Sequence, residues 1–150
     1  MPSELVNKVA LSLFSVPPLL HRKTRRRMGA TGNLDIDQNI THLHFEIIKV
    51  LSEEHTMRVA EIGKTLHVAK AQMTQLINKL VALNMVERHV DPKDRRAINI
   101  TLTERGRQFM EEAKEAIIID LQVMLADLNE QELNELYDGL QKIRKIVDKL

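Results

Sequence analysis

The chain has 150 residues, a formal net charge of +1 and no cysteine. That length suits one domain with a substantial core and is too short for two full domains. The lack of cysteine excludes disulfides and thiolate metal sites within these residues, and it predicts a protein of a reducing compartment, the cytoplasm. No predicted segment reaches the roughly 20 apolar residues that a membrane-spanning helix needs, so we expect no membrane partner.

The charge is distributed unevenly along the chain. Residues 56–107 carry ten Lys or Arg against five Asp or Glu, whereas residues 108–150 carry five against ten. The middle third is therefore basic and the C-terminal part acidic. A basic region of this kind is typical of a surface that binds DNA.

The N-terminal 30 residues are predicted to form a helix that bends near Pro17, because an interior proline loses a hydrogen bond and clashes with the preceding turn. Ser15 is a candidate cap for a new helical start there. Residues 29–39 contain the turn formers and are predicted to connect this helix to the next. The run 21–27 is strongly basic, and two interpretations stay open, a contact with DNA or solvated charges at a helix end.

Three helices are predicted between residues 41 and 83. The first follows Thr41, should end near His55, and carries an apolar stripe of Leu43, Ile47, Ile48 and Leu51. A short helix from Arg58 to Leu66, a turn at residues 67–69 and a helix from Lys70 to Leu83 then form a helix-turn-helix. Its second helix should bury Met73, Leu76, Ile77, Leu80 and Leu83. The opposite face is polar and cationic and comprises Lys70, Gln72, Thr74, Gln75, Asn78 and Lys79.

A β-hairpin with a charged tip is predicted next. Residues 85–90 and 97–102 are rich in the branched side chains that favour strands, and the loop between them carries Lys93, Asp94, Arg95 and Arg96. Clustered cations add little stability to an exposed hairpin, whereas the dense negative charge of a nucleic acid attracts them. We therefore predict that this hairpin contacts a nucleic-acid backbone.

Two long amphipathic helices are predicted from Thr103 onward, with a break at Asn129. The final helix carries an apolar stripe that includes Leu133, Leu136, Tyr137, Leu140, Ile143 and Val147. These helices and the N-terminal one have more apolar surface than so small a core can cover, so we expect them to pack against a second copy of the chain. The predicted organisation is one compact domain with an N-terminal dimerisation helix and linker (1–39), a DNA-binding lobe (40–104) and C-terminal dimerisation helices (105–150).

Metal binding and catalysis find little support in the sequence. His42 and His44 are the closest histidine pair, but two positions apart on a helix they point about 200° away from each other, which disfavours a shared ion. No nucleophile, base and orienting acid form a recognisable set, and there is no Gly-rich phosphate loop. We therefore expect no metal, no cofactor and no enzymatic activity.

From Thr41 to Gly106 the chain resembles the MarR family of winged helix-turn-helix regulators. The order of elements carries this resemblance, together with the wing motifs Asp94-Arg95-Arg96-Ala97 and Leu102-Thr103-Glu104-Arg105-Gly106. It implies a mainly α fold with a small β-hairpin wing and an obligate homodimer held by N- and C-terminal helices. It also implies a recognition helix in the major groove and the wing in the adjacent minor groove. Arg96 matches the family's minor-groove arginine, and Asp94 matches the acid that orients it.

Three positions depart from the family pattern. Ala69 stands where Ser usually caps the recognition helix, and Gln75 stands where Arg or another base reader is common. His67 replaces the usual turn glycine, and the turn should survive because histidine can adopt the left-handed conformation. These changes bear on which DNA sequence is read.

The sequence thus predicts a sequence-specific transcriptional regulator, a repressor that binds a pseudo-palindromic operator as a homodimer. Base reading is assigned to Gln72, Gln75 and their neighbours, and phosphate contacts to Lys70, Thr74, Lys79 and Arg95. The resemblance further implies release from DNA by a small effector, frequently aromatic or phenolic. Two alternatives stay open, a winged-helix module that docks protein partners and an architectural protein that binds any duplex equally.

Overall fold

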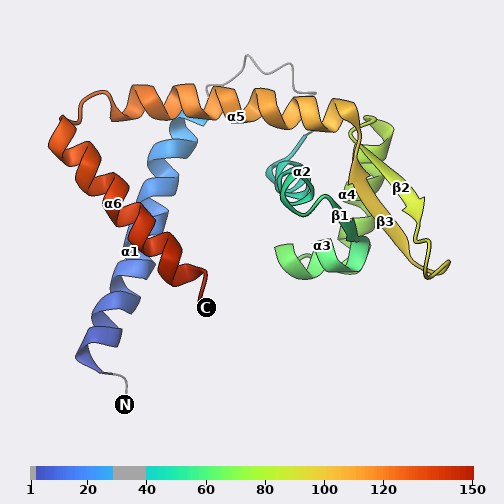
Figure 1. Cartoon of the computed structure of the whole chain (residues 1–150), viewed down its shortest axis with the longest axis horizontal. Coiled ribbons are helices and arrows are strands. Elements are labelled where there is room, and N and C mark those ends of the chain that lie inside the picture. The colour runs from blue at the N-terminus through green and yellow to red at the C-terminus, as the bar shows by residue number, and fades with distance from the viewer. Residues whose placement is uncertain (1–2, 29–39) are drawn as a thin grey trace. The chain divides into compact units, whose positions relative to one another are not determined.

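The computed structural model describes residues 3–28 and 40–150 (Figure 1). The chain divides into two compact units, residues 1–31 with 116–150, and residues 32–115, which we call the lobe. The predicted connection at residues 29–39 lies outside the described residues. The structure is mainly helical with one small sheet, which confirms the predicted fold class. None of the described helices is both long enough and apolar enough to cross a membrane.

Helix α1 runs without interruption from Glu4 to Met28 and contains both Pro17 and Pro18. The predicted new helical start at Ser15 is therefore wrong. The Ser15 hydroxyl donates instead to the carbonyl oxygen of Leu11, one turn back along the same helix, at 2.9 Å. A serine inside a helix can satisfy its hydroxyl in this way without acting as a cap. Every side chain of α1 that the structure describes is exposed.

The three predicted helices of the lobe are present as α2 (His42–Glu54), α3 (Val59–Leu66) and α4 (Lys70–Ala82). His67 joins α3 to α4 in the left-handed conformation, with φ 54° and ψ 43°, so the turn forms without glycine. Ala69 is the N-cap residue of α4 and provides no side-chain cap, as the sequence predicts. The helix-turn-helix is confirmed.

Three antiparallel strands, β1 (Thr56–Arg58), β2 (Val86–Val90) and β3 (Ile98–Leu102), form one sheet in the order β1-β3-β2. Strands β2 and β3 confirm the predicted hairpin, with Val86 opposite Leu102 and Val90 opposite Ile98. The sequence does not predict β1, because three residues are too few to show an alternating pattern. This short strand matters for the hairpin, since it pairs with β3 along the side that β2 leaves open.

The core of the lobe lies between α2, α3, α4, the sheet and the start of α5 (Glu104–Leu125). Its fully or nearly fully buried side chains include Ile47, Ile48, Leu51, Ile62, Met73, Ile77, Leu80, Ile100 and Leu102. Gly106 permits the close approach of α5, because a Cβ there would lie 2.1 Å from the carbonyl oxygen of Met85. The lobe therefore completes a core within one chain.

Helix α6 (Glu130–Val147) begins at the predicted break. The Asn129 side chain accepts a hydrogen bond from the Glu132 N–H, and the Glu132 carboxylate accepts one from the Asn129 N–H, both at 2.9 Å. This reciprocal capping box fixes the start of the helix. No residue of α6 is buried.

Candidate nucleic-acid interface

The six predicted recognition residues all lie on one helix, α4. Lys70, Gln72, Thr74, Gln75 and Asn78 are exposed, and Lys79 is half-buried. Beneath them Met73, Ile77 and Leu80 are buried, so the apolar stripe anchors the helix and turns the polar face outward. Among the described residues, the Gln72 and Gln75 amides have no hydrogen-bond partner. Two amides are thus available to a ligand outside the chain.

Two recognition residues are already engaged inside the chain. The Thr74 hydroxyl donates to the Lys70 carbonyl oxygen at 3.0 Å. The Asn78 side-chain oxygen accepts a hydrogen bond from the Arg88 guanidinium of β2. The sequence gives no signal for Arg88, because an arginine within a strand pattern is ordinarily a solvated edge residue. Its bond to Asn78 ties the recognition helix to the hairpin.

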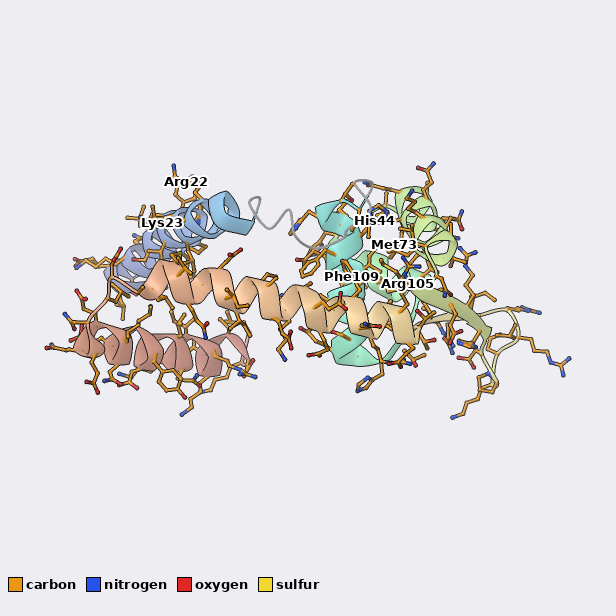
Figure 2. The ribbon with its side chains drawn as sticks, turned by 90° about the horizontal axis from the view of Figure 1, so that it is seen from above. Arg22, Lys23, His44, Met73, Arg105 and Phe109 are labelled. Atoms are coloured by element: carbon orange, nitrogen blue, oxygen red, sulfur yellow. The ribbon has the colours of Figure 1, made fainter. Side chains whose placement is uncertain are left out.

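Lys79 is close enough to the buried His44 to affect its charge. His44, near the start of α2, is 6% exposed, and its Nδ1 accepts a hydrogen bond from the Thr41 N–H at 3.0 Å. Burial lowers the pKa of His44, and the positive charge of Lys79 lowers it further. Figure 2 shows His44 and Met73 in the region where α2 and α4 meet. The helical spacing of apolar residues does not predict that His44 is buried, because histidine occurs both in protein cores and on protein surfaces.

Asp91 organises the loop at the tip of the hairpin. Its Oδ1 accepts the N–H groups of Lys93 at 2.8 Å and Asp94 at 3.1 Å, and its Oδ2 accepts the Asn99 amide at 3.1 Å. The Arg58 guanidinium lies 3.4 Å from the same Oδ2. The Lys93 N–H, followed by the Asn99 amide, holds the pKa of Asp91 below its usual range.

Asp91 is not among the functional residues predicted from the sequence. The signal was present, because an Asp followed by Pro favours a turn in which the carboxylate accepts the N–H two residues further on. The partners Arg58 and Asn99 have no comparable signal, since 33 and 8 residues separate them from Asp91.

The predicted wing residues all lie on this loop and are exposed: Lys93, Asp94, Arg95 and Arg96. Asp94 accepts the backbone N–H of Arg96 at 3.0 Å, so it acts on the backbone of Arg96 and not on its guanidinium. In the described part of the chain, none of the three wing cations has an acidic partner within ion-pair distance. Figure 2 shows nitrogen-bearing side chains projecting from this end of the hairpin. The loop therefore presents cations without internal neutralisation.

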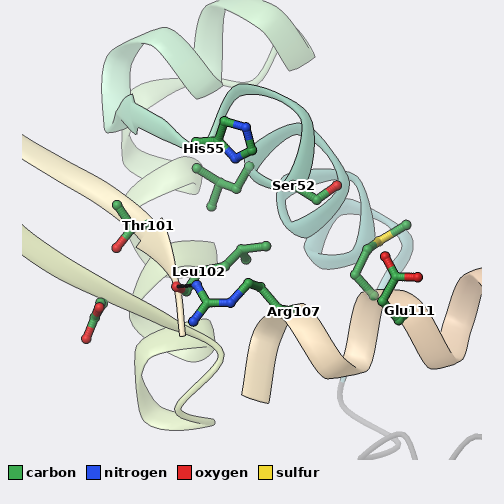
Figure 3. Close-up of a pocket in the computed structure, with 9 residues that line it drawn as sticks. Ser52, His55, Thr101, Leu102, Arg107 and Glu111 are labelled. Carbon is green, nitrogen blue, oxygen red and sulfur yellow. Dashed lines mark hydrogen bonds between the residues drawn. The ribbon is translucent and has the colours of Figure 1, made fainter. Parts of the chain in front are cut away.

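A cavity of about 470 Å³ lies elsewhere in the lobe, between the end of α2, the sheet and the start of α5. Figure 3 shows His55, Ser52, Thr101, Leu102, Arg107 and Glu111 around it. The Arg107 guanidinium donates to the Leu102 carbonyl oxygen at 2.9 Å and pairs with Glu104. His55 caps α2 with φ 65° and ψ −50°, an uncommon conformation for a residue with a side chain. Both apolar and polar side chains line the cavity.

The predicted dimer residues lie along α6 at helical spacing and stay uncovered in the single chain. Their exposed fractions range from 38% for Leu133 to 61% for Tyr137, with Leu136, Leu140, Ile143 and Val147 between these values. Helix α1 is similar, with Phe14 81% exposed. Of the basic run 21–27, the structure describes the side chains of Arg22 and Lys23, which are exposed on α1 (Figure 2).

Comparison with known proteins identifies the type of lobe. A family model described as the MarR family matches residues 38–97. YpoP of Bacillus subtilis, an uncharacterized HTH-type transcriptional regulator, is 28% identical over 108 residues, which cover 72% of this chain and 77% of that protein. The HTH-type transcriptional regulator FarR of Neisseria gonorrhoeae is 25% identical over 75% of this chain and 77% of that protein.

Solved structures agree with this assignment. The transcriptional regulator BldR of Sulfolobus solfataricus superposes with a TM-score of 0.63 at 28% identity, covering 96% of this chain and 99% of that one. A mutant of MarR from E. coli, complexed with operator DNA, has a TM-score of 0.63 at 23% identity, covering 94% and 99%. Over residues 38–97 the chain thus matches the model of the MarR family, and its helix-turn-helix and wing are similar to those of the regulators named above.

Proposed function

We propose that the protein is a homodimeric repressor that binds a pseudo-palindromic DNA operator, acts in the cytoplasm and catalyses no reaction. The observation that carries this proposal is that one lobe combines a polar helix face with a cationic hairpin tip. Among the described residues, the Gln72 and Gln75 amides of that face and the cations of that tip have no partner. The solved complex of a related MarR with operator DNA supports the same function. The basic middle of the chain supplies the electrostatic attraction.

Base reading is assigned to α4. The amides of Gln72 and Gln75 are exposed and have no partner among the described residues. A glutamine amide can pair with the N6 and N7 of adenine through two hydrogen bonds, so A·T pairs are expected within each half-site. Lys70 and Lys79 lie on the same helix and are assigned to phosphates, although Lys79 also borders His44.

The wing is assigned to the minor groove. A narrow A·T-rich minor groove has an enhanced negative potential that attracts arginine side chains. Arg96 is exposed, and the bond from its N–H to Asp94 fixes its backbone before DNA is bound. Arg95 and Lys93 are assigned to the flanking phosphates.

Dimerisation is assigned to α1, α6 and the second half of α5. Exposed apolar residues on α6, such as Leu136, Tyr137 and Leu140, would bury their surface against a second copy. A two-fold dimer presents two recognition helices to half-sites about one helical turn apart. This arrangement explains why the operator should be pseudo-palindromic.

We propose in addition that a small aromatic or phenolic molecule releases the protein from DNA. The family resemblance supports this proposal. The cavity of about 470 Å³ in the lobe has the size of a small-ligand site and is one place to seek the effector. A ligand that binds the free protein more tightly than the DNA-bound protein must weaken DNA binding by the same factor.

Selection of duplexes from a random pool, followed by titration at several salt concentrations, tests the main proposal. The logarithm of the binding constant should fall with log salt, with a slope of about −0.9 per phosphate contacted.

The wing is tested by substitution. Arg96→Ala should lose about 1–3 kcal/mol of binding free energy, whereas Arg105→Ala, which removes an equal charge from an exposed position of α5, should lose less. Failure of the wild-type protein to bind any duplex would favour a protein-docking module. Equal affinity for selected and random duplexes would favour an architectural protein.

A further inference from the structure

The lower part of the hairpin is held by the lobe, because β1 pairs with residues 99–101 of β3 and Val86, Ile100 and Leu102 are buried, whereas the loop extends beyond β1. Three residues, 83–85, link α4 to β2, and the tip lies beyond five paired residues of each strand. At about 3.3 Å per residue the tip stands roughly 16 Å from the start of β2, so a small change in the bend or twist of the strands would displace the wing cations by several ångströms. Side-chain contacts of the hairpin can therefore adjust the position of the wing relative to α4.

One lateral tie joins the tip to the helix-turn-helix. Arg58 ends β1 and is the N-cap residue of α3, and its guanidinium pairs with Asp91 at 3.4 Å. The same Asp91 carboxylate shapes the loop through the N–H groups of Lys93 and Asp94. The Asp91 side chain is 16% exposed and that of Arg58 is 45% exposed. Because Arg58 is partly exposed and its contact with Asp91 is long, the ion pair itself contributes little to folding stability, and its main effect is on geometry.

A second tie reaches α4 from the other edge of the sheet. Arg88 lies on β2, two residues from buried Val86 and therefore on the same face of the strand. Its guanidinium donates to Asn78, which lies one turn beyond Thr74 and Gln75 on the recognition face of α4. Arg58 approaches from the β1 side and Arg88 acts on β2, so together the two ties restrict the hairpin on both edges.

We propose that Arg58, Asp91 and Arg88 are positioning residues that set the distance between the wing and the recognition helix before DNA binds. This inference rests on the proposed DNA-binding function. Arg58 and Arg88 form contacts inside the lobe, whereas Lys93, Arg95 and Arg96 have no acidic partner in the part of the chain that the structure describes and can contact DNA. A wing that is already in place loses less conformational entropy on binding, and affinity rises for that reason.

Asp91→Asn gives a decisive test because electrostatics and positioning predict opposite signs. Removal of a negative charge beside the wing should strengthen binding to the DNA polyanion if charge alone matters. Positioning predicts instead a loss of about tenfold, equivalent to 1.4 kcal/mol, with an unchanged salt slope because the same phosphates are contacted. Glu87→Gln removes the same charge from exposed β2 without touching the loop, and it should bind as tightly as the wild type or more tightly.

Charge-conserving variants test the two ties separately. Arg58→Lys and Arg88→Lys keep the charge but lose the planar fork of donors, so each should weaken operator binding, whereas Arg105→Lys should not. Amide hydrogen exchange of the free protein supplies a readout without DNA, because Lys93 and Asp94 should lose protection in Asp91→Ala, which removes the oxygen that accepts their N–H groups.

The outcomes separate the two proposals. If the wild type binds a selected duplex while Asp91→Asn matches Glu87→Gln and both lysine variants match Arg105→Lys, the positioning inference is wrong and the DNA-binding function stands. If the wild type binds no duplex, the proposed function itself is wrong. If Asp91→Asn does not fold, the two lysine variants decide the question.

Discussion

The lobe and the terminal helices use their apolar residues in opposite ways. In the lobe, Ile47, Ile62 and Ile77 have no exposed surface, whereas Phe14 on α1 and Tyr137 on α6 are more than half exposed. Burial of apolar surface contributes about 25 cal/mol per Å², so the lobe gains its stability within one chain. The terminal helices do not bury their apolar surface within one chain, and in the proposed dimer they would bury it against a second copy. Stability of the lobe and assembly of the protein should therefore respond to different substitutions.

The largest expected effect is on assembly. Replacement of Leu136 and Leu140 together by Glu should convert the dimer to a monomer, because an unpaired carboxylate buried at an interface costs several kcal/mol. Sedimentation equilibrium would measure the halved mass. Val90→Glu is the control, since Val90 is a 58% exposed apolar residue of the lobe and its substitution should leave the mass unchanged. A dimer that survives the double substitution would place the interface elsewhere.

A pair of glycine substitutions compares the two regions directly. Gly106→Ala should destabilise the lobe by about 3 kcal/mol, because the new Cβ would collide with the Met85 carbonyl oxygen. Gly139→Ala on α6 has nothing within 4 Å and should raise stability by up to about 1 kcal/mol through helix propensity. Urea denaturation measures both. Similar losses in the two variants would show that α6 is as closely packed as the lobe.

A smaller gain is expected at the start of the recognition helix. Ala69→Ser should stabilise the lobe by about 1 kcal/mol, because a serine at this N-cap can accept an N–H of the first turn. Ala71→Ser, inside the same helix, should cost about 0.5 kcal/mol. Thermal unfolding of the two variants would distinguish them, and an unchanged Ala69→Ser midpoint would mean that the donor is already satisfied.

The smallest effect concerns pH. The folded pKa of His44 lies below its unfolded value, so the unfolded chain binds more protons and stability should fall as the pH drops below about 6.5. The loss levels off below the folded pKa. Protonation would also remove the Nδ1 lone pair that accepts the Thr41 N–H. Urea midpoints at about pH 7.5 and 5.5 should differ less in His44→Gln than in wild type, while exposed His42→Gln should behave like wild type.

Much of the candidate site follows from local sequence. The spacing of Met73, Ile77 and Leu80 fixes which face of α4 is buried, and so it predicts that Gln72 and Gln75 point outward. The branched residues on either side of the charged loop predict the hairpin in the same way. The roles of Arg88 and Arg58 cannot be predicted in this way, because the tertiary fold determines which residues they contact. Arg88 meets Asn78 from a different element, and Arg58 meets Asp91 across 33 positions.

Local sequence is enough to predict the order of the elements, the outward face of the recognition helix and the cationic tip of the hairpin, because each depends on residues within a few positions of one another. The three-dimensional fold is needed to see that β1 joins the sheet, that His44 is buried and that Asp91 holds the wing loop. Strand pairing, burial and long-range hydrogen bonds depend on which distant segments meet. Local periodicity does not encode that choice.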